Sequence, residues 1–201
     1  MDKKLQIIGL SGTNGAGKDA VGQLLAAKHN YMFISVTDLL REELKRRGLA
    51  IERKNMRALS AEWRRQYGLA VLIDRALEQY QAASANHRGV VMASLRNPYE
   101  ADRVHELGGT VMWVDADPKV RYQRIQANAA TRGRGGEDNK TFGQFLAEEQ
   151  AEMHQSGDKA TLNMGAVQQR ADVTVLNNGD SLDVLLRDVD TALGLTDKDI
   201  A

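Results

Sequence analysis

The feature that most constrains the fold is a glycine-rich segment near the start of the chain, GLSGTNGAGKD at residues 9–19. In it, Gly12 is followed by four residues and then by Gly17 and Lys18. Glycines let successive backbone N–H groups curl around an anion, and a lysine adds positive charge. A helix that begins here directs the positive end of its dipole at the same point. The segment is therefore predicted to bind phosphate.

The flanking segments supply the context that such a loop needs. The apolar run at residues 5–10 predicts a buried strand, and residues 20–28 carry apolar side chains at helical spacing. A strand, this loop and then a helix is the arrangement of the P-loop of nucleotide-binding proteins, which makes a turn without a ligand the weaker interpretation. Asp19 stands where that motif usually has Ser or Thr. The residues expected to bind a nucleoside triphosphate are Gly12, Thr13, Asn14, Gly15, Ala16, Gly17, Lys18, Asp19 and Ala20.

Composition narrows the class of protein. The formal net charge of zero argues against a nucleic acid or an anionic membrane as the partner. The chain has no cysteine, which excludes disulfides, thiolate zinc sites and cysteine nucleophiles. The first apolar run is too short for a signal peptide, and no stretch has the length of a membrane span. We expect a cytoplasmic protein.

Strand and helix signals alternate along the rest of the chain. Further strands are predicted at residues 31–36, 89–94, 110–114 and 172–176. Helices are predicted at residues 37–47, 52–67, 69–85, 97–107, 118–128, 142–153 and 181–193. Five apolar strands alternating with helices indicate an α/β P-loop fold, a five-stranded parallel sheet with helices on both faces. We expect a single domain over residues 1–201, with a polar, glycine-rich loop at 129–141 and a frayed tail at 194–201.

Two segments resemble known small-molecule kinases. Residues 34–42, ISVTDLLRE, resemble the acceptor-binding corner of adenylate kinases, although Val36 and Thr37 replace the usual Thr-Gly pair. Residues 94–101, SLRNPYEA, resemble a strand end of phage-type deoxynucleoside monophosphate kinases, of dephospho-CoA-kinase-like proteins and of a poorly characterised archaeal relative. The Gly-Lys-Asp ending of the loop is also similar to the phage enzymes.

The resemblance to the P-loop nucleoside monophosphate kinase superfamily implies separate sites for a phosphoryl donor and a phosphoryl acceptor. Mg-ATP would be the donor, with Asn178 beside its adenine, and a small-molecule nucleotide would be the acceptor. An acceptor-binding insertion is expected at about residues 36–86 and a lid at about 125–141. The expected acceptor-binding residues are Ser35, Thr37, Asp38, Arg41, Arg64, Arg96 and Glu100. The expected catalytic residues are Lys18, Asp38, Arg124, Arg132 and Arg134.

A magnesium site is expected between the loop and the third strand. Relatives often carry an aspartate where this chain has Ser94, so our hypothesis is that Asp19 supplies the missing carboxylate. Asp19 and Ser94 are therefore the candidate metal residues.

Several conspicuous side chains have simpler interpretations. The arginines expected to be solvated surface charges are Arg46, Arg47, Arg53 and Arg75, whereas Arg57, Arg64 and Arg65 stay open. Trp63 and Tyr67, one helical turn apart, are more typical of a core than of a base-stacking platform. The four histidines show no metal-ligand spacing, and a surface position is favoured for His29, His87, His105 and His154.

Three functions remain open at this point. The first choice is phosphorylation of a nucleoside or deoxynucleoside monophosphate. The second is a dephospho-CoA kinase, in which Asp38 would act as base toward a ribose hydroxyl. The third is an ATP-binding switch or degenerate kinase, because Asp19 and Ser94 both depart from the usual metal site. The sequence leaves open a monomer or a homodimer.

Overall fold

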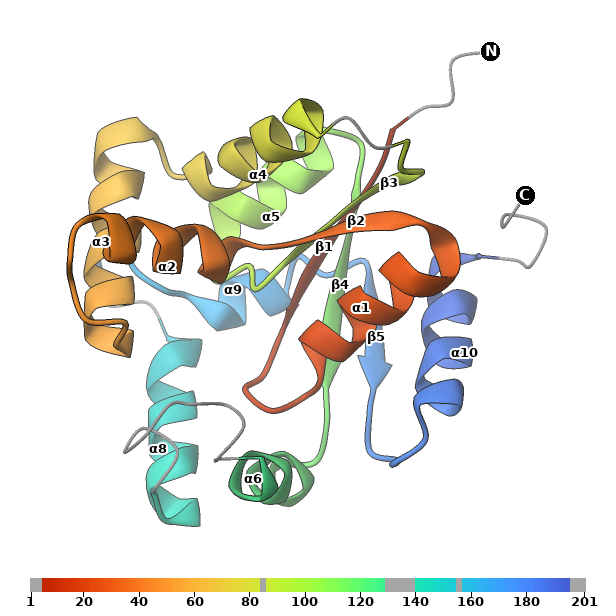
Figure 1. Cartoon of the computed structure of the whole chain (residues 1–201). Helices are drawn as coiled ribbons and strands as arrows, with labels where there is room; N and C mark the ends of the chain where they lie inside the picture. The colour runs from red at the N-terminus through yellow and green to blue at the C-terminus, as the bar shows by residue number, and fades with distance from the viewer. Residues whose placement is uncertain (1–4, 84–85, 129–139, 155–156, 196–201) are drawn as a thin grey trace.

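The computed structural model describes residues 5–83, 86–128, 140–154 and 157–195. Its centre is one all-parallel sheet with the strand order β2-β3-β1-β4-β5 (Figure 1). The strands are β1 (Gln6–Gly12), β2 (Tyr31–Ser35), β3 (Gly89–Ala93), β4 (Thr110–Asp115) and β5 (Val173–Leu176). The predicted α/β fold with five parallel strands is confirmed.

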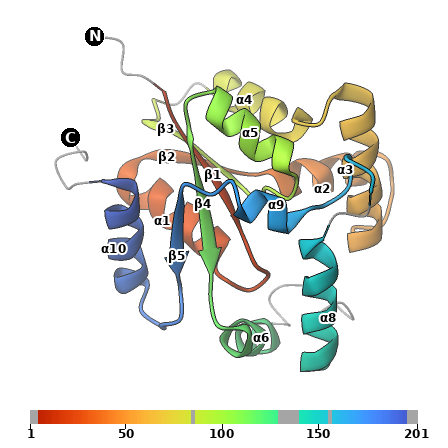
Figure 2. The same cartoon turned by 180° about the vertical axis from the view of Figure 1, so that it is seen from behind.

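Helices cover both faces of this sheet (Figures 1 and 2). Helices α1 (Lys18–His29) and α10 (Leu182–Leu193) pack on one face, and α4 (Val71–Ala82), α5 (Pro98–Glu106) and α9 (Met164–Gln168) pack on the other. Successive side chains of a strand point to opposite faces. Val91 therefore packs toward α1, while Met92 packs toward α4 and α5. Both faces being buried explains why the strands are continuous apolar runs.

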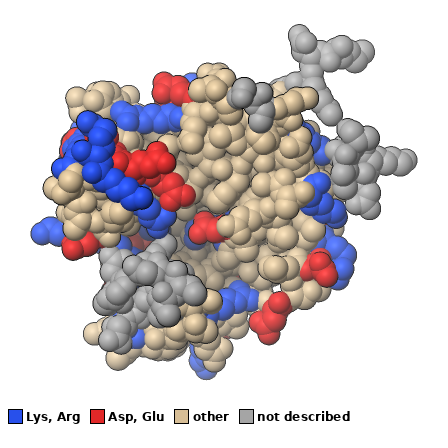
Figure 3. Space-filling model, in the orientation of Figure 1, with Lys and Arg blue, Asp and Glu red and all other residues tan. Residues whose placement is uncertain are grey.

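The remaining helices lie beyond the carboxyl ends of the strands. Helices α2 (Val36–Arg46) and α3 (Arg53–Tyr67) form an arm, and α6 (Pro118–Ala127) and α8 (Phe142–Met153) lie together below the sheet in Figure 1. Charged side chains of both signs gather over α2 and α3 (Figure 3). Among them, Arg47 contacts Glu43 at 2.6 Å and Glu62 at 2.8 Å, which links the two helices. Polar helices thus surround the edge of the sheet at which the strands have their carboxyl ends.

Some expectations differ from the structure. Helix α9 was not predicted, and α1 begins at Lys18 rather than at residue 20. His29 is not on the surface: it is 2% exposed, and its Nε2 lies 2.7 Å from Asp190 Oδ1, which joins α1 to α10. Trp63 is buried as expected, whereas Tyr67 is 54% exposed. Most of the expected lid, residues 129–139, lies outside the described residues, as does the tail from residue 196.

Within the described part of the chain, no helix combines the length and the apolar character needed to cross a bilayer.

Candidate functional site

The phosphate-binding loop has the backbone that its glycines allow. Gly12, Gly15 and Gly17 have φ angles of 140°, 84° and 99°. A Cβ added at Gly12 would lie 1.9 Å from the carbonyl oxygen of Val114, and one at Gly17 would lie 2.6 Å from Asn177 Nδ2. No other residue fits these two positions without a shift of the backbone or of a neighbour. The loop therefore has the tight turn between β1 and α1 that its sequence predicts.

Lys18 is folded back over this loop. Its Nζ donates to the carbonyl oxygens of Gly12, at 2.9 Å, and Thr13, at 2.7 Å. Burial and the positive charge of Arg96 lower the pKa of Lys18 to about 7, although Asp19 and Glu152 oppose the shift. A bound anion would favour the charged ammonium. The site is therefore electrostatically prepared for a negative ligand.

Side chains around the loop fasten it to its surroundings. Thr13 Oγ1 donates to Asp115 Oδ1 at 2.6 Å, at the end of β4. Asn177 Nδ2 donates to the Ala16 carbonyl at 2.9 Å, and Arg124 Nη1 donates to the Asn177 carbonyl at 2.7 Å. Arg124 was expected to act on phosphate; here it also lines the cavity described below, with its guanidinium held by the loop after β5.

Three further candidates for the loop and the adenine site are Ala16, Ala20 and Asn178, which do not line the cavity described below. Asn178 Oδ1 accepts from the Asp117 amide at 2.7 Å, which joins the loops that follow β5 and β4. Ala16 is fully buried and Ala20 is partly buried. Ala16 is thus packed within the phosphate-binding loop, whereas Asn178 joins the two neighbouring loops.

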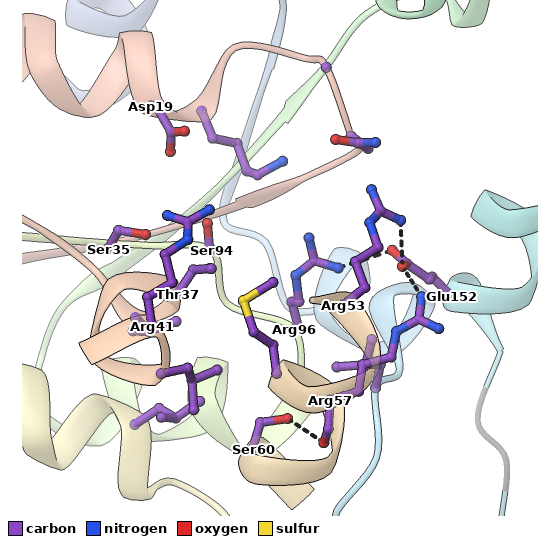
Figure 4. Close-up of a pocket in the computed structure, with 18 of the residues that line it drawn as sticks. Asp19, Ser35, Thr37, Arg41, Arg53, Arg57, Ser60, Ser94, Arg96 and Glu152 are labelled. Atoms are coloured by element: carbon purple, nitrogen blue, oxygen red, sulfur yellow. Dashed lines mark hydrogen bonds and ion pairs between the residues drawn. The ribbon is translucent and has the colours of Figure 1, made fainter. Parts of the chain in front are cut away.

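A cavity of about 740 Å³ extends from the loop to α3 (Figure 4). It opens beyond the carboxyl ends of the strands, where open α/β sheets bind ligands. The predicted site residues that it brings together are Asn14, Gly15, Gly17, Lys18, Asp19, Ser35, Thr37, Arg41, Arg64, Ser94, Arg96 and Arg124. Aliphatic side chains complete its wall, namely Val36, Leu40, Met56, Leu72 and Leu162.

The wall formed by α3, α8 and the segment after β3 carries a cluster of four charged residues, Arg53, Arg57, Arg96 and Glu152, here called the arginine–Glu152 cluster (Figure 4). The Glu152 carboxylate lies 2.5 Å from Arg57 Nη2, 3.0 Å from Arg96 Nη1 and 3.6 Å from Arg53 Nη1. Burial raises the pKa of Glu152, but Arg96, Arg53 and Arg57 together outweigh burial and lower it. Sequence reasoning missed Glu152, and the surface position expected for Arg53 is wrong, since its side chain is only 20% exposed in this wall.

Arg64 and Glu100, two predicted acceptor residues, form a buried ion pair, and Arg64 also lines the cavity. Their side chains are 1% and 0% exposed, and Arg64 Nη2 lies 2.6 Å from Glu100 Oε1. The other carboxylate oxygen accepts the backbone N–H groups of Arg96, at 2.8 Å, and Asn97, at 3.1 Å. Glu100 does not line the cavity. The pair holds Arg96 in place from behind.

Asp38 is also outside the cavity. Its side chain is 56% exposed and pairs with Arg41, one turn further along α2, at 2.5 Å. Arg41 itself points into the cavity toward the loop (Figure 4). The two residues expected in one acceptor corner therefore contact each other, but only Arg41 lines the cavity.

Asp19 and Ser94, the metal candidates, line the same cavity (Figure 4). Ser94 has a φ of 73°, a conformation that non-glycine residues rarely adopt and that is concentrated at functional sites. A carboxylate and hydroxyl groups are oxygen ligands of the kind that Mg²⁺ prefers. In the described part of the chain there is no group of three or more acidic or histidine side chains that could hold a metal ion.

Two of the expected catalytic residues, Arg132 and Arg134, lie outside the described residues.

Comparison with known proteins agrees with this geometry. The sequence model of a family described as AAA domain matches residues 8–153. The UPF0200 protein of Methanococcus maripaludis is 24% identical over 181 residues, which are 89% of this chain and 91% of the relative. The UPF0200 protein of Pyrococcus abyssi is 27% identical over 194 residues, 93% and 95% of the two chains. Neither name states an activity.

The fold also recurs in solved structures. Shikimate kinase from Bacteroides thetaiotaomicron superposes with a TM-score of 0.63 at 15% identity, over 95% of this chain and 99% of that enzyme. At this identity the likeness is one of fold. The chain belongs to the AAA domain family and has the fold of the P-loop kinase superfamily.

Proposed function

We propose that this protein is a small-molecule kinase that transfers the γ-phosphoryl group of Mg-ATP to a nucleoside or deoxynucleoside monophosphate. The observation that carries the proposal is one cavity lined both by the phosphate-binding loop and by the arginine–Glu152 cluster. Phosphoryl transfer requires positioning and positive charge more than covalent chemistry by the protein. Both requirements are met by side chains that line this cavity.

The donor half fits a triphosphate. The N–H groups of the loop and the amino terminus of α1 suit the β-phosphate, and Lys18 can turn from the carbonyls of Gly12 and Thr13 toward an anion. Mg²⁺, when bound, would neutralise charge on the transferred group, and Asp19 with Ser94 would hold it. Arg124 lies beside the same loop and the residues that follow β5, where Asn178 suits the adenine side.

The acceptor half favours a phosphate over a hydroxyl. The guanidinium groups of Arg41, Arg96, Arg53 and Arg57 line the cavity, and a planar, permanently charged guanidinium suits a phosphate group. A dephospho-CoA kinase would need a base at the acceptor hydroxyl, and Asp38, which was expected to serve, does not line the cavity and pairs with Arg41. The aliphatic wall offers apolar surface for the rest of the acceptor, such as a nucleobase.

Turnover with a panel of acceptors tests this proposal. The protein is incubated with Mg-ATP and each common ribo- and deoxynucleoside monophosphate, or with dephospho-CoA, and ADP release is followed. We expect stimulation by at least one monophosphate and loss of that stimulation in Lys18→Ala. Stimulation by dephospho-CoA alone would replace the proposal with the hydroxyl kinase. Saturable ATP binding without stimulation by any acceptor would indicate the degenerate kinase.

The role of Asp19 needs a test of its own. Replacement of Asp19 by Ala should lower turnover and raise the magnesium concentration needed for half-maximal rate, since the carboxylate lines the cavity beside Ser94. Ser94→Asp in the Asp19→Ala background should restore part of the loss, because it returns a carboxylate to the third strand's end. Unchanged magnesium dependence in Asp19→Ala would remove Asp19 from the metal site.

A further inference from the structure

In the arginine–Glu152 cluster, the Glu152 carboxylate of α8 contacts three guanidinium groups, two from α3 and one from the segment between β3 and α5. One of the three, that of Arg53, also contacts Glu148 of α8 at 3.5 Å. The Glu152 side chain is 13% exposed and lies at the cavity wall (Figure 4). The Arg64–Glu100 pair behind it is one-to-one and buried, as a purely structural pair would be.

We infer that Glu152 is an internal counter-ion that occupies the subsite for the acceptor's anionic group, and that it makes this subsite select a phosphate dianion over a carboxylate. The placement of the acceptor rests on the proposed function. In the empty protein Glu152 holds the three arginines together, and the acceptor's phosphate displaces its carboxylate.

The selectivity follows from the chemistry of the two anions. A carboxylate ligand brings one charge and two oxygens, the same set that Glu152 already offers. Glu152 is tethered to the site at an effective concentration on the order of millimolar or more, so a dilute free carboxylate gains nothing by replacing it. A phosphate dianion brings a second charge and a third oxygen, and it can accept from all three guanidinium groups at once.

Glu148 provides a matched comparison on the same helix. It lies one turn before Glu152, contacts Arg53 at 3.5 Å and pairs with Lys140, and its side chain is 48% exposed. It therefore carries the same charge as Glu152, but its contacts reach one arginine of the cluster, Arg53, where those of Glu152 reach all three. Glu148→Gln removes one negative charge from α8, as Glu152→Gln does, but leaves the subsite filled.

Calorimetric titration with inorganic phosphate and with acetate tests the inference. Wild type, Glu152→Gln and Glu148→Gln are titrated at mildly alkaline pH with the donor loop saturated by magnesium and a non-hydrolysable ATP analogue. We expect phosphate to bind Glu152→Gln at least about tenfold more tightly than wild type, since a like charge has been removed. Acetate should bind measurably only to Glu152→Gln, and Glu148→Gln should resemble wild type.

Two outcomes would overturn the inference. In the first, phosphate binds Glu152→Gln no more tightly than it binds wild type or Glu148→Gln. In the second, wild type binds acetate with the same affinity as phosphate. Thermal denaturation confirms that each variant is folded, and Glu152→Ala replaces Glu152→Gln if the amide variant unfolds.

A double variant separates this inference from the proposed function. Adding Arg57→Ala to Glu152→Gln should erase the gain in phosphate affinity, whether or not the ATP analogue binds the loop. If no acceptor stimulates ADP release but Glu152→Gln still binds phosphate more tightly, the proposed kinase activity is contradicted and the counter-ion role of Glu152 is not. If an acceptor stimulates ADP release but Glu152→Gln binds phosphate no more tightly, the counter-ion role is contradicted and the kinase activity is not.

Discussion

At the residue scale, the proposed binding of ATP depends most on the ammonium group of Lys18. Burial, and secondarily the nearby Arg96, lower its pKa to about 7, whereas the unfolded chain has the ordinary value of 10.5. A polyphosphate interacts with the charged form only, so binding must raise this pKa and take up a proton. Donor binding is therefore linked to pH above neutrality.

The sign of this linkage gives a prediction. As pH rises from about 7 to about 9, free Lys18 loses its proton while the complex retains it, so affinity for ATP should fall by a factor that approaches tenfold per pH unit. Equilibrium binding of a fluorescent ATP analogue across this range checks it. Lys18→Ala should bind weakly with little pH dependence in the same range. Wild-type affinity that is independent of pH would contradict the lowered pKa.

Individual residues also show where prediction from sequence stops. The loop glycines and Lys18 could be predicted because their spacing along the chain is itself the signal. Glu152 could not, since it is one of several acids on an ordinary polar helix, and only the fold places it opposite residues about a hundred positions earlier. Arg53 looked like a solvated charge for the same reason. His29 and Asp190 are likewise brought together by the packing of α1 against α10.

At the scale of elements, the amino terminus of α5 connects the core to the cavity wall that holds Arg96. Asn97 and Glu100 form a capping box there, and Glu100 also accepts from Arg64 of α3. Asn97 Nδ2 donates to the carbonyls of Lys159 and Thr161, which holds the segment before α9. One helix start thus fixes α3, α9 and the backbone of Arg96 relative to one another.

This connection predicts a large loss of stability when Glu100 is removed. Glu100→Ala would leave the Arg64 guanidinium buried without its partner, so we expect the free energy of unfolding to fall by about 3–5 kcal/mol. Urea denaturation measures the change. Glu106→Ala, which breaks the more exposed pair with Arg103 on the same helix, should cost less than about 1 kcal/mol. Similar losses in the two variants would contradict the structural role of Glu100.

The elements themselves were largely predictable because both faces of the sheet are buried. Continuous apolar strands and amphipathic helices leave a strong periodic signal, and the strands β1 to β5 all lie where the sequence indicates. Helix α9 was not predicted, since Met164–Gln168 is barely more than one turn long and its one local signal is the N-cap Asn163. It packs against α5 and α8.

For the molecule as a whole, the two walls of the cavity should act on different substrates. Arg57→Ala removes a guanidinium from the arginine–Glu152 cluster, so we expect the KM for the acceptor to rise by about tenfold or more while the KM for ATP changes little. Steady-state kinetics with each substrate varied in turn measures both constants. The control is Arg65→Ala, which removes an exposed arginine of the same helix that pairs with Asp158 and does not line the cavity. An equal rise in both KM values would contradict two separate subsites.

A bisubstrate analogue, two nucleosides joined by a polyphosphate chain, tests most directly whether one cavity holds donor and acceptor together. If it does, the second nucleotide binds intramolecularly, and the analogue should bind at least about a hundredfold more tightly than ATP. Both Lys18→Ala and Arg57→Ala should weaken its binding, since each wall holds one end. Binding no tighter than that of ATP, or insensitive to Arg57→Ala, would contradict the shared cavity.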